Sequence, residues 1–212
     1  MQQPELFSAA PIDRQYYEQQ ALHRGYRILA GIDEAGRGAL CGPVVAAAVI
    51  LPVGVRLDGV DDSKKLSPTK RDQLYELIMS RAISVGIGFG SPELIDRINI
   101  LQATRHAMLE ALTGLSPQPD MLLIDGITTI NTPLPQKTIK KGDSLSLTIA
   151  AASIIAKVSR DRLMCELDSA HPGYGFATHK GYGCASHMEA IRLLGPSPVH
   201  RLTFRGVKEH VR

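Results

Sequence analysis

Short apolar runs separated by turn residues are the main pattern along this chain. Runs bounded by glycine, proline or aspartate are typical of buried strands, and they predict strands at residues 28–33, 44–51, 83–89, 121–124 and 138–139. Two Ser-Pro pairs begin helical patterns, because serine caps a helix and proline suits its first position. They predict helices at residues 67–81 and 91–112, the second broken near Asn99.

Three further helices complete the predicted order of elements. They are expected at residues 13–23, 144–169 and 186–194, and the middle of the long one, residues 150–155, is apolar on most sides and therefore buried. Strands come first in a cluster and then alternate with helices. This order predicts an α/β fold with a mixed sheet that has helices on both faces.

Length and composition fit one globular domain. The chain has 212 residues, of which 44% are hydrophobic and 21% are charged. Residues 1–25 are polar and glutamine-rich, so we expect a partly disordered tail there and a single domain at 26–212. The net charge of +3 permits a polyanion partner but does not establish one.

The cysteines and the apolar stretches favour a cytoplasmic protein. Cys41, Cys165 and Cys184 are odd in number and lack the spacing of a metal site, so reduced thiols are expected. The first residues lack the layout of a secretion signal. The longest apolar stretches fall short of the roughly 18 residues that span a bilayer, so we expect no membrane partner.

The segment Asp33-Glu34-Ala35-Gly36-Arg37-Gly38 is the strongest sign of chemistry. It follows the first predicted strand directly. Acids at a strand end can hold a divalent cation, and a glycine turn lets backbone amides approach a substrate closely. The arginine between the glycines offers a fork of donors that suits phosphate.

Two more acids occur in a similar setting. Asp125 ends an apolar strand before Gly126, and Asp143 follows Gly142. Carboxylates crowded at one sheet edge repel by roughly 4 kcal/mol at about 4 Å, and hard cations such as Mg²⁺ or Mn²⁺ relieve that repulsion. Two such ions can activate water and stabilise the leaving oxygen of a phosphodiester. Each acid alone could instead cap a helix or end a strand, but all four beside an arginine turn favour a metal site.

Seven segments, in order, resemble the type 2 ribonucleases H, and among them the bacterial ribonucleases HII. The resemblance covers residues 28–208. It rests on Asp33-Glu34-Ala35-Gly36-Arg37-Gly38, Asp62-Ser63-Lys64-Lys65-Leu66-Ser67, Leu123-Ile124-Asp125-Gly126, Lys141-Gly142-Asp143, Ala151-Ala152-Ser153-Ile154-Ile155-Ala156-Lys157-Val158, His179-Lys180-Gly181-Tyr182 and His200-Arg201-Leu202-Thr203-Phe204.

The resemblance implies a ribonuclease H-like, five-stranded mixed sheet flanked by helices, with a C-terminal helical segment. It also implies an endoribonuclease that cuts RNA in RNA–DNA hybrids and single ribonucleotides embedded in duplex DNA. The cut would lie 5′ of the ribonucleotide and leave a 3′-hydroxyl and a 5′-phosphate. Such an enzyme would serve ribonucleotide removal in DNA repair and replication, and we expect it to act as a monomer.

Residue roles follow from the same resemblance. The implied catalytic and metal-binding acids, which would hold two Mn²⁺ or Mg²⁺ ions, are Asp33, Glu34, Asp125 and Asp143. Gly36, Arg37 and Gly38 would sense the ribose 2′-hydroxyl and grip the neighbouring phosphate, and Tyr182 would stack on the adjoining sugar. Backbone contact with a 2′-hydroxyl distinguishes RNA from DNA without reading the base. Lys64 is expected to contact phosphate, as opposed to being an ordinary exposed loop charge.

The remaining basic and histidine residues also have ordinary structural interpretations. Lys140, Lys141, Lys157, Arg160 and Lys180 could extend a basic groove or form a solvated face. Asp161 is expected to be an ion-pair partner in its helix. His179 and His187 have no spaced cysteine or histidine partner, so zinc is not expected.

The N-terminal tail contains one short motif. Gln3-Pro4-Glu5-Leu6-Phe7 looks like the glutamine–leucine–phenylalanine peptides that dock on replication sliding clamps. Two apolar anchors on a disordered tail could insert into a clamp pocket. Short motifs also recur by chance, so a terminus without function is the alternative.

Two other functions remain open at this point. Another polynucleotidyl transferase of the same fold, such as an integrase or a junction resolvase, would also place acids on a central sheet but needs no ribose-reading turn. A nucleic-acid-binding module with structural acids would bind in a salt-dependent manner and form no metal-dependent product.

Overall fold

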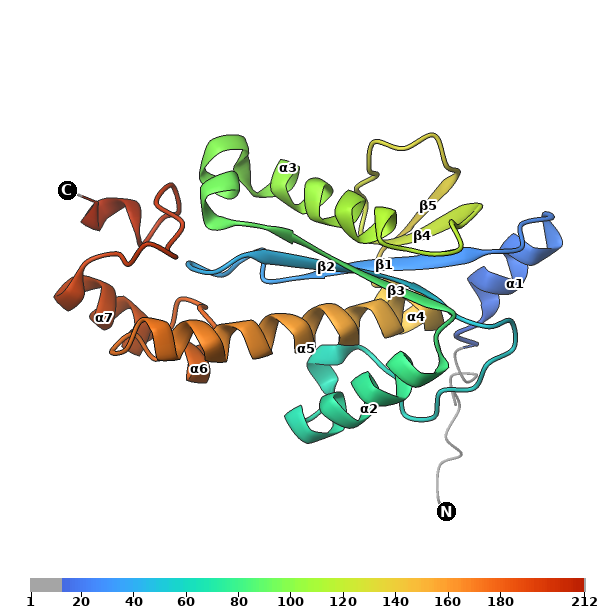
Figure 1. Cartoon of the computed structure of the whole chain (residues 1–212), viewed down its shortest axis with the longest axis horizontal. Helices are drawn as coiled ribbons and strands as arrows, with labels where there is room; N and C mark the ends of the chain where they lie inside the picture. Colours follow the sequence, from blue (N-terminus) through green and yellow to red (C-terminus); the bar gives the residue numbers. More distant parts are fainter. Residues whose placement is uncertain (1–12, 212) are drawn as a thin grey trace, which may run out of the picture.

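A five-stranded sheet lies between two layers of helices in the computed structural model, which describes residues 13–211 (Figure 1). The strand order is β3-β2-β1-β4-β5. The first three strands pair antiparallel, whereas β4 and β5 add to β1 in parallel. Their bounds are β1 Leu29–Ala35, β2 Val44–Ile50, β3 Ser84–Gly90, β4 Met121–Asp125 and β5 Gln136–Ile139. The predicted mixed sheet is thereby confirmed, with each strand within a few residues of its expected place.

The central strands are apolar and small because helices cover both faces. Every residue of β2 is buried, and its alternate side chains belong to two separate cores. Gly31 on β1 lies so close to the first turn of α5 (Leu147–Ala170) that an added Cβ would sit 2.2 Å from the carbonyl carbon of Thr148. A glycine at this position is what lets the helix backbone approach the sheet.

The helices α2 (Pro68–Arg81) and α3 (Pro92–Thr113) begin where the sequence predicts. α2 and α5 cover one face of the sheet, and α3 covers the other (Figure 1). The Ser67 hydroxyl accepts a hydrogen bond from the Lys70 amide, and the Ser91 hydroxyl accepts one from the Leu94 amide. The predicted break in α3 is confirmed, since Asn99 has φ of 69°.

The predicted helix at residues 144–169 is two helices, and that prediction was wrong about its start. α4 (Gly142–Leu145) is followed by Ser146, whose extended backbone (φ −127°, ψ 130°) separates it from α5. The Ser146 hydroxyl lies 3.3 Å from the Ile149 amide and 2.7 Å from the Glu18 carboxylate. Serine competes for backbone hydrogen bonds in this way and favours helix caps over helix interiors.

The C-terminal segment forms one end of the molecule. α6 (Phe176–His179) and α7 (Ala185–Leu194) lie there with the 3₁₀ turn η2 (Lys208–His210) (Figure 1). α7 matches the predicted helix, whereas α6, η2 and the 3₁₀ turn η1 (Ser63–Lys65) were not predicted. Buried Leu40, Ile191 and Val207 attach this end to the loop that follows β1.

The predicted N-terminal region is described only in part. Its expected helix is confirmed as α1 (Tyr16–His23). The clamp-like segment, residues 3–7, lies outside the described residues. Within residues 13–211, the structure contains no helix that is both long and apolar enough to cross a membrane.

Candidate functional site

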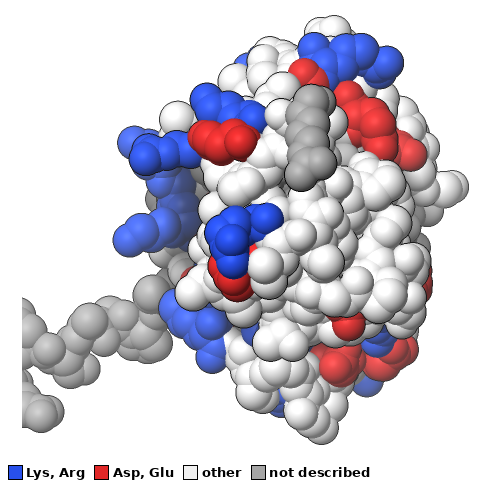
Figure 2. Space-filling view, turned by 90° about the vertical axis from the view of Figure 1, so that its left-hand side faces the viewer, with Lys and Arg blue, Asp and Glu red and all other residues white. Residues whose placement is uncertain are grey.

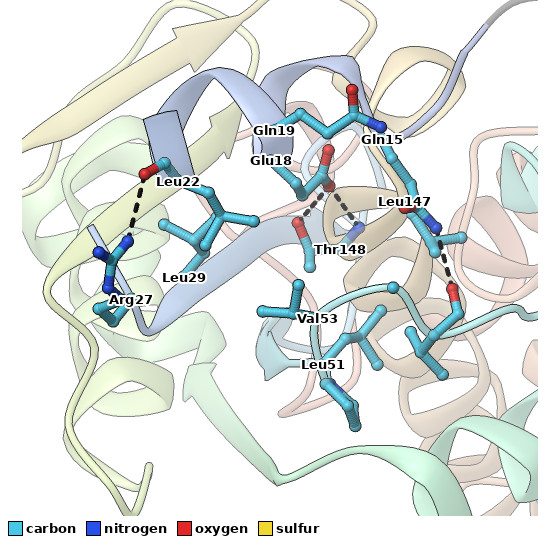
Figure 3. Close-up of a pocket in the computed structure, with 13 residues that line it drawn as sticks. Gln15, Glu18, Gln19, Leu22, Arg27, Leu29, Leu51, Val53, Leu147 and Thr148 are labelled. Atoms are coloured by element: carbon cyan, nitrogen blue, oxygen red, sulfur yellow. Dashed lines mark hydrogen bonds between the residues drawn. The ribbon is translucent and has the colours of Figure 1, made fainter. Parts of the chain in front are cut away.

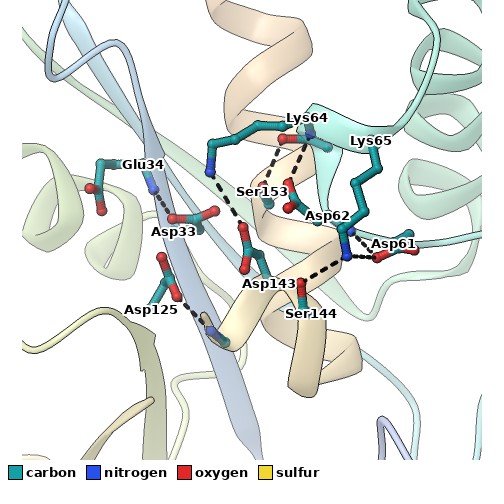
Figure 4. Close-up of polar contacts among 12 residues, drawn as sticks. Asp33, Glu34, Asp61, Asp62, Lys64, Lys65, Asp125, Asp143, Ser144 and Ser153 are labelled. Atoms are coloured by element: carbon teal, nitrogen blue, oxygen red, sulfur yellow. Dashed lines mark hydrogen bonds and ion pairs between the residues drawn. The ribbon is translucent and has the colours of Figure 1, made fainter. Parts of the chain in front are cut away.

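Three carboxylates meet at one edge of the sheet. Asp33 lies near the end of β1, Asp125 ends the neighbouring parallel strand β4, and Asp143 lies in the first turn of α4. A ligand oxygen from each lies within 4.8 Å of the others, and Figure 4 shows the three side chains facing one another. The parallel pairing of β1 and β4 places the first two acids side by side, as the sequence predicted.

Local backbone contacts hold the acids in place. The Gly142 amide donates a 2.6 Å hydrogen bond to Asp125 Oδ1, and the Glu34 amide donates a 2.7 Å bond to Asp33 Oδ1. Lys141, in the left-handed conformation with φ of 58°, turns the chain into α4. The turn that carries Asp143 is therefore tied to the end of β4.

Burial and the charges of neighbouring carboxylates raise the pKa values of Asp33 and Asp143. Burial raises the pKa of Asp33 well above its usual value, and the charges of Glu34 and Asp125 raise it further. The pKa of Asp143 is raised by burial first and then by the Asp125 charge. Lys64 Nζ lies 3.4 Å from Asp143 Oδ2, but the lysine side chain is 76% exposed, so this pair is screened by solvent. The excess negative charge and the oxygen-only donors fit a divalent cation.

Glu34 lies beside the three aspartates but is not part of the cluster that they form. Its Oε1 accepts a 3.1 Å hydrogen bond from Arg37 Nη1 (Figure 4 shows the carboxylate to one side). Burial raises the pKa of Glu34, and the Arg37 charge opposes that change. The role of Glu34 as a metal ligand stays a prediction.

The predicted substrate-binding residues line one cavity next to the acids. They are Gly36, Arg37, Gly38, Lys64 and Tyr182. Tyr182 is 41% exposed and so presents its ring to solvent at the cavity. Sequence reasoning missed Ser63 and Ser153, which also line it and whose hydroxyls lie 2.9 Å apart. Both fall in the matched segments, but their small side chains gave no chemical signal.

Not all of the basic residues that the sequence singled out lie on the surface. Seen from the end that holds α7, Lys and Arg side chains gather along one edge of the molecule (Figure 2). Arg160, for which a basic groove and a solvated face were both left open, belongs to neither: it is 1% exposed and donates to backbone carbonyls. Lys157 lines the cavity and pairs with Asp161 at 2.7 Å, which confirms the ion-pair role expected for that aspartate.

A buried histidine pair lies beneath the Tyr182 loop. The Ser197 amide donates to His200 Nδ1, so the proton of His200 is on Nε2, which lies 3.1 Å from His187 Nε2. His187 therefore carries its proton on Nδ1 and donates to the Tyr182 carbonyl at 3.0 Å. Cys41 Sγ lies within 4.8 Å of ring nitrogens of both histidines. These hydrogen bonds use every ring nitrogen of the pair, so the cluster is structural and zinc is not assigned to it.

A second, mostly apolar cavity lies at the other end of β1, between α1 and the loop after β2 (Figure 3). Leu29, Leu51 and Val53 line it, and Glu18 Oε1 accepts hydrogen bonds there from the Thr148 amide and hydroxyl. None of the predicted site residues lies in this cavity. The acidic cluster is therefore the candidate active site.

Comparisons with known sequences identify the family to which the chain is similar. A model of the Ribonuclease HII family matches residues 30–207. The chain is similar to the Ribonuclease HII of Pelobacter propionicus, with 78% identity over all of this chain and 96% of the relative. It is also similar to that of Geobacter sulfurreducens, with 65% identity over 92% of this chain and 90% of the relative.

Solved structures share the fold. The ribonuclease H2 of Pyrococcus horikoshii aligns with a TM-score of 0.73 at 26% identity, over 86% of this chain and 96% of its own. The RNase HII of Archaeoglobus fulgidus, solved in complex with PCNA, aligns with a TM-score of 0.72 at 30% identity, over 84% and 96%. Bst-RNase HIII in complex with Mn²⁺ aligns with a TM-score of 0.65 at 22% identity, over 90% and 71%. The expected arrangement of sheet and helices is thereby confirmed.

Proposed function

Because the chain belongs to the ribonuclease HII family and is therefore a ribonuclease H endonuclease, we propose that it cuts duplex DNA on the 5′ side of a single embedded ribonucleotide. The products would be a 3′-hydroxyl and a 5′-phosphate. Continuous RNA in RNA–DNA hybrids would be cut by the same site. This activity would serve ribonucleotide removal during DNA repair and replication.

The meeting of Asp33, Asp125 and Asp143 within 4.8 Å is the observation that carries the proposal. Carboxylate oxygens without histidine or cysteine favour Mg²⁺ or Mn²⁺. We propose that these three acids, with Glu34 beside them, hold two such ions. Bound ions of this kind activate water and stabilise the leaving oxygen of a phosphodiester. A solved structural relative, Bst-RNase HIII, binds Mn²⁺.

The neighbouring cavity supplies the recognition of the ribonucleotide. Backbone groups of Gly36 and Gly38 would contact the ribose 2′-hydroxyl, and the Arg37 guanidinium would bind a phosphate next to it. The Tyr182 ring would stack on the adjoining sugar and disfavour a second 2′-hydroxyl at that position. The exposed Lys64 ammonium lies close enough to the acids to contact a backbone phosphate.

One cleavage experiment tests the proposal. A DNA duplex with one ribonucleotide is incubated with Mg²⁺, with Mn²⁺ or with a chelator, and the cut is mapped to the nucleotide. We expect a single metal-dependent cut 5′ of the ribonucleotide and none in an all-DNA duplex. Equal cutting of the all-DNA duplex would favour a resolvase-like enzyme, and binding without cleavage would favour a binding module.

We also propose that residues 3–7 dock on a sliding clamp. The support is the motif itself, Gln3-Pro4-Glu5-Leu6-Phe7, and a similar RNase HII that was solved in complex with PCNA. Replacing Leu6 and Phe7 with alanine should abolish binding of the full chain to the clamp, measured by surface plasmon resonance, and leave cleavage unchanged. Unchanged clamp binding would reject this role.

A further inference from the structure

Two buried arginines connect the glycine turn (residues 36–38) to the segment that carries Tyr182 (residues 180–182). We propose that Arg201 and Arg160 are positioning residues that set the distance between the turn that reads the 2′-hydroxyl and the ring that reads the next sugar. This proposal rests on the proposed function and deepens it. Neither guanidinium would touch the substrate, since Arg201 is 0% exposed and Arg160 is 1% exposed.

Arg201 holds the glycine turn through hydrogen bonds to its backbone carbonyls. Its Nη2 donates to the Gly36 carbonyl at 2.8 Å, and its Nη1 donates to the Arg37 carbonyl at 2.9 Å. Its Nε donates to the Gly42 carbonyl at 3.0 Å. The rigid, planar fork of a guanidinium therefore fixes both ends of the loop that follows β1.

Arg160 joins the same loop to the other reading segment. Its Nε and Nη2 donate to the Pro43 and Cys41 carbonyls at 3.1 and 3.2 Å, and its Nη1 donates to the Lys180 carbonyl at 2.8 Å. The guanidinium carbon also lies 5.5 Å from the centre of the Tyr182 ring. One side chain thus contacts both the loop after β1 and the segment that carries Tyr182.

Gly36 shows how closely this arrangement is packed. With φ of +91°, it lies against Arg160, and an added Cβ would meet the Nε of that arginine at 1.9 Å. The turn therefore rests directly on the guanidinium. A change in the shape or position of Arg160 would displace the turn with respect to Tyr182.

The two charges have no carboxylate partner among residues 13–211. None of the ion pairs in this part of the chain includes Arg160 or Arg201. Burial, and then the charge of Arg160, lowers the pKa of Arg201 to about 9, which still leaves it protonated near neutral pH. Two buried cations whose described hydrogen bonds all go to main-chain carbonyls are costly for a purely structural purpose. Their position beside the loop that would bind phosphate therefore favours a role in recognition of the substrate.

The proposal is tested by the ratio of kcat/KM for the single-ribonucleotide duplex to kcat/KM for the continuous hybrid. A single ribonucleotide presents one 2′-hydroxyl in one register. A continuous hybrid presents one at every position, so its cleavage should be less sensitive to displacement of the glycine turn. The Arg201→Lys and Arg160→Lys variants keep the charge but lose the planar fork. Arg192→Lys is the matched control, because Arg192 is an exposed residue of α7 that pairs with Glu189.

We expect kcat/KM for the single-ribonucleotide duplex to fall about 100-fold in each variant, since a displacement near 1 Å has effects of that size. The loss on the continuous hybrid should be at least about tenfold smaller, with Mn²⁺ affinity from calorimetry unchanged. The Arg192→Lys control should match the wild type in all three measurements. If the Arg201→Lys variant does not fold, the Arg160→Lys variant provides the same test.

Two results would overturn the proposal. One is an unchanged ratio of the two kcat/KM values in a folded variant, which includes an equal loss on both substrates. The other is a changed Mn²⁺ affinity, which places the effect at the acids. A wild-type protein that cuts neither substrate would instead reject the proposed function. The failure of the arginine role and the failure of the enzyme assignment are therefore distinct.

Discussion

The Gly142 amide donates a 2.6 Å hydrogen bond to Asp125 Oδ1, and this contact joins the turn that carries Asp143 to the end of β4. An added Cβ at Gly142 would lie 2.6 Å from the Ile149 Cδ1 atom and 3.3 Å from Asp125 Oδ1. The spacing of two of the three clustered acids therefore depends on a residue without a side chain.

Gly142→Ala should lower metal-dependent cleavage by about tenfold, because a catalytic group displaced by a fraction of an ångström loses much of its effect. Cleavage rates at saturating Mn²⁺ measure this. Gly114→Ala is the control, since a Cβ there meets only ordinary contacts at 3.5 Å or more and φ is −73°. Equal rates for both variants would show that the acids tolerate this displacement.

Asp33→Asn and Asp125→Asn should each lower cleavage by at least about 1,000-fold, because each removes a charged ligand from the proposed metal site. Binding to the ribonucleotide duplex, measured by fluorescence anisotropy with chelator present, should change little. Asp72→Asn, at an exposed residue of α2 that is 3.6 Å from Arg162, is the control. Wild-type turnover by either site variant would remove that acid from the mechanism.

Tyr182→Ala should lower kcat/KM for the single-ribonucleotide duplex by about 10- to 100-fold, the range typical of losing one stacking contact. Tyr182→Phe keeps the ring and should remain within a few-fold of the wild type. Steady-state kinetics with both variants measure the contribution of the ring. A loss of the same size in Tyr182→Phe would assign the effect to the hydroxyl and reject stacking.

Lys64→Ala should raise KM with little change in kcat, since the exposed ammonium would contact phosphate and not the reacting atoms. The slope of log binding constant against log salt should fall by about one unit. Lys70→Ala, at another exposed lysine, should leave that slope unchanged. A slope equal to that of the wild type would mean that Lys64 makes no phosphate contact.

Acid should destabilise the fold through the buried histidine pair. Burial, then the nearby His187 charge, lowers the pKa of His200 to about 4, and burial lowers that of His187. Between pH 6.5 and about 4 the unfolded chain therefore binds more protons than the folded one, so stability decreases as pH falls through this range. At pH 5 the loss from His200 alone is about 2 kcal/mol relative to pH 7.

Urea unfolding at pH 7 and pH 5 measures this effect. His200→Gln should reduce the difference in unfolding free energy between the two pH values, even though it lowers stability at pH 7. His23→Gln, which changes an exposed histidine, should keep the wild-type difference. A difference that is the same in all three proteins would mean that other groups cause the acid sensitivity.

Local signals explain which parts of the fold could be predicted. Ser67 and Ser91 begin helices through their own hydroxyls, and Asn99 breaks α3 at its own residue, so a window of a few residues contains the information. The acids could be placed at one sheet edge because each follows an apolar strand or a short extended segment.

Long-range contacts explain the rest. The break before α5 depends on Ser146 and on Glu18, which comes from a helix near the other end of the chain. From the sequence, Arg160 is expected to be an exposed charge on a helix. Its burial depends on hydrogen bonds to the carbonyls of Cys41, Pro43 and Lys180. Such partners have no fixed spacing, so no sequence pattern reveals them.

The parallel pairing of β1 with β4, which is made much later, has a consequence during protein synthesis. The hairpin of β1 and β2 emerges early from the ribosome, but Asp125 and Asp143 are made much later. A nascent chain that ends before β4 carries the glycine turn and Asp33 but lacks the other two acids of the proposed metal site. That site can therefore form only after β4 has docked beside β1 and α4 has been made.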